Sequence, residues 1–363
     1  MIALQNIAVC QPFMPPMESY TEKLHGIWQR NRITNNGPLV KELEEELRQY
    51  LNVPYLHFVA NGTIALQIAI RSLELKGDVI TTPFSYVAST TSIIWENCQP
   101  LFVDIDPLTM CIDPKKIEDA ITPETTAIVA THVYGYSCDV EAIRSIADRH
   151  GLKVIYDAAH AFGSSFQGSS LLSHGDVTAV SFHATKIFHT VEGGAVITHN
   201  EKLAEKMFLM KTFGHREEEF ICAGINGKNS EFHAAMGLCV LPYVESLIKA
   251  RKELWESYCI NLANAGLVLP YLQSGLDYNY AYFPVIFQSD KELLYVKERL
   301  QSENIITRRY FYPSLNKLPY LKGADCPVAE TVAERVLCLP LYSDLQMEQV
   351  AYISSIITEA LNP

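Results

Sequence analysis

The chain has 363 residues, of which 48% are hydrophobic and 19% are charged, and this length suits two domains better than one core. Its formal net charge is -12, which argues against nucleic acid as a main partner because phosphate binding needs a basic surface. The sequence has no apolar run long enough to span a membrane, no signal-peptide pattern and no CxxC pair among its nine cysteines, so we expect a cytoplasmic protein with reduced thiols and no membrane partner.

Helices and short apolar strands alternate through the first part of the chain. Residues 38–51 predict a helix because apolar residues repeat there at helical spacing. Further helices are predicted at residues 64–75 and 140–150, the second ended by Gly151. Buried strands are predicted at residues 56–60, 79–82, 101–104, 127–133, 154–157, 177–182 and 195–198. This alternation predicts an α/β fold whose mostly parallel sheet is covered on both faces and binds ligands at the carboxyl ends of its strands.

The pattern changes after about residue 235. A long helical stretch runs to about residue 263, and a strand is predicted at residues 282–287. Two capping boxes predict the starts of later helices: Ser289 with Glu292, and Ser343 with Gln346. We therefore predict a large domain at residues 1–235 and a smaller α+β domain at residues 236–363.

Lys186 is the first candidate for chemistry. It lies in Ser181-Phe-His-Ala-Thr-Lys, where a predicted strand ends in a loop, and Glu192-Gly-Gly opens the next strand. A lysine at the mouth of a sheet can be desolvated, which lowers its pKa and exposes a neutral amine able to form an imine. A solvated surface lysine is the alternative interpretation of the same position.

Asp157 and His160 form the second candidate group, in Asp157-Ala-Ala-His-Ala-Phe-Gly. A carboxylate at a strand end could keep a pyridinium nitrogen protonated, and the histidine could hydrogen-bond a phenolic oxygen on the same ring. Two alternatives stay open. One is a metal pair, although no further ligands have convincing spacing, and the other is a helix cap beside a core histidine.

The segment Asn61-Gly62-Thr63 follows a predicted strand and opens a helix. Free backbone N–H groups and the helix dipole predict an anion site there that suits a phosphate, although any capped helix has these features. Tyr86, in Pro83-Phe-Ser-Tyr, could stack on an aromatic ring, or belong to the core. A lysine, a carboxylate, an anion site and an aromatic ring at strand ends are together what a pyridoxal phosphate site requires.

On these motifs the chain resembles the sugar aminotransferases of the DegT/DnrJ/EryC1/StrS family over nearly its whole length. The resemblance rests on the Asp157 and Lys186 motifs together with Asn35-Asn-Gly-Pro-Leu-Val-Lys-Glu-Leu-Glu, Ala60-Asn-Gly-Thr, Pro83-Phe-Ser-Tyr, Glu192-Gly-Gly and Arg308-Arg-Tyr-Phe-Tyr-Pro. It implies fold type I, with a mostly parallel seven-stranded sheet sandwiched by helices and a smaller C-terminal α+β domain. It also implies pyridoxal 5'-phosphate as cofactor and no metal.

The resemblance implies a role for each candidate residue. Lys186 would carry the cofactor as an imine and act as the catalytic base and acid. The implied cofactor-binding residues are Gly62, Thr63, Tyr86, Asp157, His160, Ser181, Lys186 and, from the other subunit of a homodimer with shared active sites, Asn226. The implied substrate-binding residues are His183, for which packing is the alternative, Lys228, Tyr310 and Tyr312. Asn229 departs from the family pattern, since many members have methionine there.

The segments SFHATK and RRYFYP resemble those of enzymes that transfer the amino group of L-glutamate to the C4 ketone of dTDP-4-keto-6-deoxy-D-glucose. The product would be dTDP-4-amino-4,6-dideoxy-D-glucose, for polysaccharide or O-antigen biosynthesis. A C3 aminotransferase acting on a dTDP-3-keto-6-deoxyhexose is the alternative, because relatives that aminate C3 share much of the sequence of these motifs. A sugar dehydratase of this family would have histidine in place of Lys186, and a non-catalytic relative would have lost Lys186 or Asp157. A dinucleotide-binding protein is disfavoured because the early strands are not followed by a GxGxxG motif.

Overall fold

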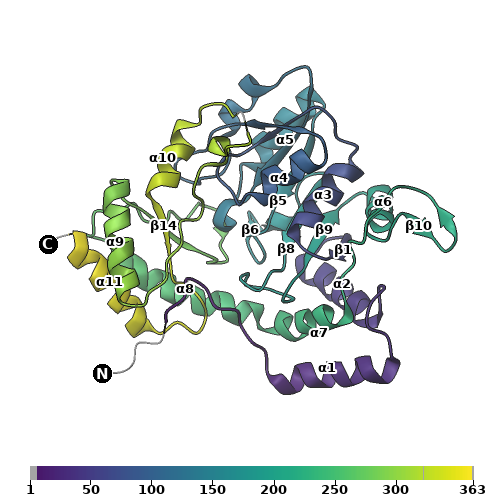
Figure 1. Cartoon of the computed structure of the whole chain (residues 1–363), viewed down its shortest axis with the longest axis horizontal. Helices are drawn as coiled ribbons and strands as arrows, with labels where there is room; N and C mark the ends of the chain where they lie inside the picture. Colours follow the sequence, from purple (N-terminus) through teal and green to yellow (C-terminus); the bar gives the residue numbers. More distant parts are fainter. Residues whose placement is uncertain (1–5, 322, 362–363) are drawn as a thin grey trace.

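The computed structural model describes residues 6–321 and 323–361 and shows helices packed around one large sheet, with a smaller group of elements beside it (Figure 1). The strand order of the large sheet is β1 (Tyr55–Val59), β9 (Gly194–Thr198), β8 (Val177–Ser181), β5 (Lys153–Asp157), β4 (Thr125–Thr131), β2 (Asp78–Thr81) and β3 (Gln99–Phe102). Neighbouring strands are parallel except at β9, which runs antiparallel to both β1 and β8. The predicted mostly parallel seven-stranded sheet is therefore confirmed.

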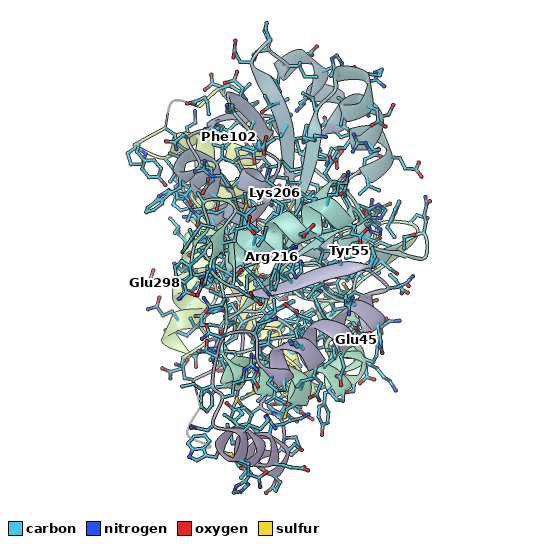
Figure 2. The ribbon with its side chains drawn as sticks, turned by 90° about the vertical axis from the view of Figure 1, so that its right-hand side faces the viewer. Glu45, Tyr55, Phe102, Lys206, Arg216 and Glu298 are labelled. Carbon is cyan, nitrogen blue, oxygen red and sulfur yellow. The ribbon has the colours of Figure 1, made fainter. Side chains whose placement is uncertain are left out.

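Both faces of the large sheet are buried, as expected for apolar strands without polar alternation. Val79 and Ile80, neighbours on β2, belong to cores on opposite faces. One face is covered by α3 (Gly62–Ser72), α4 (Ala88–Trp95) and α6 (Glu201–Lys211), and the other by α5 (Val140–His150), α2 (Pro38–Leu51), α7 (Glu231–Val240) and α1 (Met17–Arg30). Figure 2 gives a second view, in which Tyr55 marks edge strand β1 and Phe102 marks edge strand β3.

The smaller group of elements follows α7 in the chain. Its strands β13 (Phe283–Ile286) and β14 (Val336–Leu339) are antiparallel and share a core with the helices α8 (Val244–Asn261), α9 (Asp290–Ser302) and α11 (Met347–Leu361). A further helix, α10 (Pro327–Arg335), directly precedes β14. Helix α8 contributes Val244 to the core under α2 and Trp255 to the core of the smaller group, so it joins the two. The division between residues 235 and 236 stays a prediction.

Three further features lie outside these layers. The short strands β6 (Ser165–Phe166), β7 (Ser169–Ser170) and β12 (Leu276–Asp277) form a small sheet, and β10 (His215–Arg216) pairs with β11 (Glu219–Phe220). The β10–β11 hairpin projects from the body beside α6 (Figure 1), and its Arg216 forms an ion pair with Glu205 of that helix. Within the described residues, no helix is long and apolar enough to cross a membrane, and the nine cysteines are free.

Some of the predicted helices and strands have the bounds that the structure shows, and others do not. The predicted helices at residues 38–51 and 140–150 have the bounds of α2 and α5, and Gly151 ends α5 in the left-handed conformation. The strand predicted at residues 127–133 instead begins at Thr125 and ends at Thr131, and α1 has no counterpart among the predicted elements.

The two predicted capping boxes have different outcomes. Ser289 caps α9, since its hydroxyl accepts from the Glu292 N–H at 3.2 Å. The capping box at Ser343 is wrong because α11 begins at Met347, and the N–H of Gln346 donates to the Gln349 side chain at 2.9 Å.

Candidate active site

A cavity of about 510 Å³ lies where two central parallel strands end. Asp157 and Ser181, the last residues of β5 and β8, both line it, as expected for ligand sites of parallel sheets. The predicted site residues that line this cavity are Gly62, Thr63, Tyr86, Asp157, His160, Ser181, His183, Lys186 and Tyr310. The structure therefore brings together residues that are far apart in the sequence.

Lys186 lies in the loop after β8 and projects its amine toward the cavity. The loop is fixed by a hydrogen bond from the Lys186 N–H to the His183 carbonyl at 2.8 Å. The Nζ atom donates to the hydroxyl of Tyr282 at 3.2 Å. Burial lowers the pKa of Lys186 to about 8, although the charges of Asp157 and other neighbours oppose this. The neutral, nucleophilic amine is therefore far more populated near neutral pH than in an ordinary solvated lysine.

Asp157 is a buried carboxylate held by two donors. Its Oδ2 accepts from the Ser89 hydroxyl at 2.6 Å, and its Oδ1 accepts from the Ala159 N–H at 3.1 Å. Burial raises the pKa of Asp157, while these hydrogen bonds and the charge of Lys186 oppose the rise. A carboxylate oriented in this way is suited to pair with a cationic group placed in the cavity.

His160 is held as a neutral ring with a defined tautomer. Its Nδ1 accepts from the Tyr134 N–H at 3.2 Å, so the proton lies on Nε2. Burial, with a smaller contribution from Lys186, lowers the pKa of His160 well below its ordinary value. The ring stacks on Phe311 at 5.5 Å between centroids. His160 therefore offers an N–H donor to a ligand.

The N-terminus of α3 forms the anion-binding part of the cavity. Asn61 caps the helix, because its Oδ1 accepts from the Ile64 N–H at 2.9 Å. No residue of the described chain accepts from the N–H groups of Gly62 and Thr63, which remain available at the positive end of the helix dipole. A Cβ added at Gly62 would lie 3.0 Å from the Cβ of Ser181. Glycine therefore allows the helix start to approach β8 closely.

Three predicted site residues lie outside the cavity of this chain. Asn226 is exposed and pairs with Thr212, next to the projecting hairpin. Lys228 lies over the ring of Phe213 at 4.5 Å, and Tyr312 is 53% exposed. Asn226 is predicted to contact the cofactor of a second subunit, and its position outside the cavity of its own chain is compatible with that. The contact itself stays a prediction.

Asn229 and the two histidines that flank Lys186, His183 and His189, each make a polar contact that defines their position. Asn229 Nδ2 donates to the Glu192 carbonyl at 2.9 Å and so fixes the loop that closes one side of the cavity. His183 lines the cavity with its Nδ1 2.9 Å from the Thr185 hydroxyl. His189 is buried, and its Nε2 lies 2.7 Å from the Phe13 carbonyl oxygen, which indicates a structural role.

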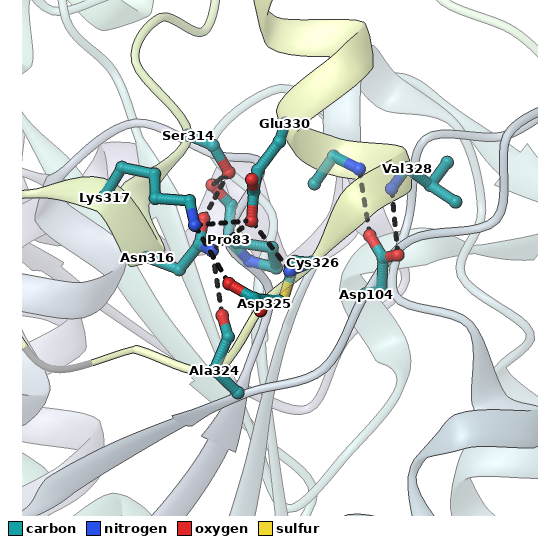
Figure 3. A network of polar contacts seen from close by, with 11 residues as sticks. Pro83, Asp104, Ser314, Asn316, Lys317, Ala324, Asp325, Cys326, Val328 and Glu330 are labelled. Atoms are coloured by element: carbon teal, nitrogen blue, oxygen red, sulfur yellow. Dashed lines mark hydrogen bonds and ion pairs between the residues drawn. The ribbon is translucent and has the colours of Figure 1, made fainter.

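A polar network fastens the C-terminal segment that carries Tyr310 to the large sheet (Figure 3). The Leu315 N–H donates to the Pro83 carbonyl at 2.7 Å, next to the loop of Tyr86. The buried Asp104 carboxylate accepts from the N–H groups of Val328 at 3.0 Å and Ala329 at 2.9 Å, in the first turn of α10. The network thereby holds one wall of the cavity in place.

Sequence reasoning missed several residues that support the site. Ser89 orients Asp157, Tyr282 holds the Lys186 amine, and Phe311 stacks on His160. The signals were present, since Ser89 follows Pro83-Phe-Ser-Tyr and Tyr282 opens a predicted strand. Their partners, however, are distant in the sequence and become neighbours only in the fold.

The sheet topology and the cavity define an α/β enzyme of the fold type I aminotransferase class. The profile of the DegT/DnrJ/EryC1/StrS aminotransferase family matches residues 17–358, and the chain belongs to this family. Members of this family depend on pyridoxal phosphate.

Named relatives are similar over almost the whole chain. The dTDP-4-amino-4,6-dideoxy-D-glucose transaminase of Shigella dysenteriae is 44% identical over 361 residues, covering 97% of this chain and 98% of the relative. The enzyme of the same name from Escherichia coli is 39% identical over 97% and 98% of the two chains. The crystal structure of DesI with its TDP-sugar product has a TM-score of 0.94 and 31% identity, covering 98% of this chain and 93% of DesI.

Proposed function

We propose that this aminotransferase moves the amino group of L-glutamate to the C4 ketone of dTDP-4-keto-6-deoxy-D-glucose. The observation that carries the proposal is the likeness, at 44% and 39% identity over almost the whole chain, to two enzymes named as dTDP-4-amino-4,6-dideoxy-D-glucose transaminases. Amination at C3 is the second candidate, supported by a Pseudomonas aeruginosa relative named as a 3-oxo sugar aminotransferase at only 32% identity. The product would serve polysaccharide or O-antigen biosynthesis.

The cavity fits pyridoxal phosphate as the cofactor. The free N–H groups of Gly62 and Thr63 at the start of α3, with the hydroxyl of Ser181 beside them, would hold its phosphate. Asp157 would pair with the ring nitrogen, the Nε2–H of His160 would donate to the ring oxygen, and Tyr86 would stack on the ring. When bound, the cofactor withdraws electrons from the carbon that carries the amino group.

Lys186 is the proposed catalytic residue. Its amine, once released from the cofactor, would take the proton from the α carbon of glutamate in the first half of the reaction. In the second half it would deliver a proton to the C4 carbon of the sugar. Tyr282 keeps Nζ in place through its 3.2 Å contact, and the lowered pKa of about 8 lets Lys186 both accept and donate a proton near neutral pH.

We also propose a homodimer with shared active sites as the working unit. Asn226 and Lys228 lie outside the cavity of their own chain, near a hairpin that projects from the body (Figure 1). From there they would contact the cofactor phosphate and the substrate of the other subunit. The proposed compartment is the cytoplasm, where the free thiols of the nine cysteines would stay reduced.

A coupled assay tests this proposal. The purified protein, supplied with pyridoxal phosphate, L-glutamate and dTDP-4-keto-6-deoxy-D-glucose, should form 2-oxoglutarate only when the keto sugar is present. The Lys186→Ala variant should bind pyridoxal phosphate without the visible absorbance of an imine and form no 2-oxoglutarate. Turnover by Lys186→Ala at the rate of the unmodified enzyme would overturn the role given to Lys186.

A further inference from the structure

The cavity holds one permanently charged cation that the proposed reaction does not use. Among the described residues that line it, the cationic side chains are Lys186 and Arg308, and the carboxylates are Asp157 and Glu192. The Lys186 amine must be neutral to react and then carries no positive charge, whereas the guanidinium of an arginine stays protonated at any physiological pH. Arg308 is therefore the cavity's lasting source of positive charge.

Arg308 is held by its backbone, while its side chain is left available. Its N–H donates to the Cys338 carbonyl at 3.3 Å and its carbonyl accepts from the Cys338 N–H at 2.8 Å, so the residue is tied to β14. Within residues 6–321 and 323–361, its guanidinium forms no hydrogen bond or ion pair. Five donors at a cavity wall without a protein acceptor suit a ligand that brings acceptor oxygens.

The next residue provides the contrast. Arg309 is used by the protein, since its guanidinium donates to the carbonyls of Ala333 at 3.3 Å and Glu334 at 2.8 Å near the end of α10. It also lies over the ring of Tyr312 at 3.6 Å. Arg309 does not line the cavity, so the two adjacent arginines have different surroundings. The tandem arginines thus separate into a structural residue and a cavity residue.

Arg308 is close to the reacting lysine. Burial raises the pKa of the Cys10 thiol, and the charges of Arg251, Lys186 and Arg308 each oppose this rise, so these cations surround the same thiol. Cys10 itself lines the cavity. Arg308 and Lys186 therefore lie around the same part of the cavity, beside Cys10.

We propose that Arg308 is a substrate-binding residue that takes an anionic oxygen group, either a carboxylate of the amino donor or a phosphate of the nucleotide sugar. This rests on the proposed function, in which both substrates are anions. The chain as a whole has a charge of -12 and repels anions, so a local cation is needed to bind them. A guanidinium matches a carboxylate or a phosphate with two parallel hydrogen bonds.

Three variants test the proposal: Arg308→Gln, Arg308→Lys and the matched control Arg309→Gln. The carboxylate arm measures the single-turnover loss of imine absorbance against L-glutamate concentration, without any sugar. The phosphate arm measures the Kd of dTDP by titration calorimetry on the protein loaded with pyridoxal phosphate. Arg308→Gln should raise the half-saturating concentration in one arm by about 10- to 100-fold, as expected for loss of a charged hydrogen-bond pair.

The outcomes separate the two sources and the two hypotheses. An effect confined to glutamate assigns the carboxylate, and an effect confined to dTDP assigns the phosphate. Arg308→Lys should recover part of the loss, and Arg309→Gln should change neither arm by more than about twofold. If Arg308→Gln matches the unmodified protein in both arms, the inference fails. If the unmodified protein does not react with glutamate at all, the proposed function fails, and the dTDP arm still decides for or against Arg308.

Discussion

Replacement of Asp104 by alanine should destabilise the fold by removing the anchor of the C-terminal wall of the cavity. The carboxylate is 6% exposed and accepts from the N–H groups of Val328, Ala329 and Ile105 at 2.9 to 3.0 Å. Helix α10 has no side-chain cap at Cys326, so its first N–H groups depend on two carboxylates (Figure 3). Glu330 accepts from the Cys326 N–H at 2.8 Å, and Asp104 accepts from the N–H groups of Val328 and Ala329.

The magnitude follows from these contacts. Loss of an N-capping side chain costs about 1 kcal/mol, and a buried N–H group left without an acceptor adds about 1–3 kcal/mol. Because the terms overlap, we expect Asp104→Ala to lower the free energy of unfolding by about 2–4 kcal/mol. Asp104→Asn keeps one acceptor oxygen and should cost about half as much.

Urea unfolding followed by circular dichroism measures this difference. Asp113→Ala is the matched control, since Asp113 accepts from the Lys115 N–H at 3.1 Å on a short surface 3-10 helix and should cost less than about 1 kcal/mol. Equal destabilisation by Asp104→Ala and Asp113→Ala would refute the anchoring role.

Three further predictions concern the cofactor. Only the neutral amine of Lys186 attacks the cofactor, and its pKa is lowered to about 8. The cofactor-free protein should therefore form the imine faster as the pH rises through about 8. The rate is measured as the growth of imine absorbance, and a rate that does not depend on pH would contradict this. Ser89→Ala removes a hydrogen bond that opposes the rise in the pKa of Asp157, so Asp157 becomes protonated at a higher pH than in the unmodified protein. The affinity for pyridoxal phosphate, measured by absorbance titration, should therefore fall first at acidic pH. An equal loss of affinity at every pH would argue against this role of Ser89. Gly62→Ala puts a Cβ 3.0 Å from that of Ser181, so equilibrium dialysis should show about tenfold weaker cofactor binding or more, and unchanged affinity would exclude the proposed phosphate site.

Local patterns predict the elements whose determinants are themselves local. Helix α2 has proline in its first turn and an apolar stripe, and Asn52 ends it in the left-handed conformation, so residues 38–51 contain all the signals. Helix α1 has one fully buried residue, Ile27, and packs on α7 far along the chain, so its stabilising contacts leave little trace in its own sequence. Strand direction is likewise not a local property, and the antiparallel course of β9 is visible only in the sheet.

The candidate site divides in the same way. Lys186 and Asp157 belong to continuous motifs at strand ends, and the topology of a parallel sheet brings such ends together. Ser89 and Tyr282 act through contacts that span 68 and 96 residues, which no spacing rule connects. Arg308 belongs to a motif that the sequence showed, yet only the fold distinguishes it from Arg309, through the cavity on one side and the hydrogen bonds of Arg309 on the other.

The most direct test of the central claim is to locate the new amine by NMR on the product made from dTDP-4-keto-6-deoxy-D-glucose and L-glutamate. We expect an amine on C4 of the sugar, formed by the unmodified protein and absent with Lys186→Ala. The C4 assignment is wrong if the enzyme binds pyridoxal phosphate and reacts with glutamate but leaves this sugar unchanged, and instead aminates a 3-keto sugar nucleotide at C3.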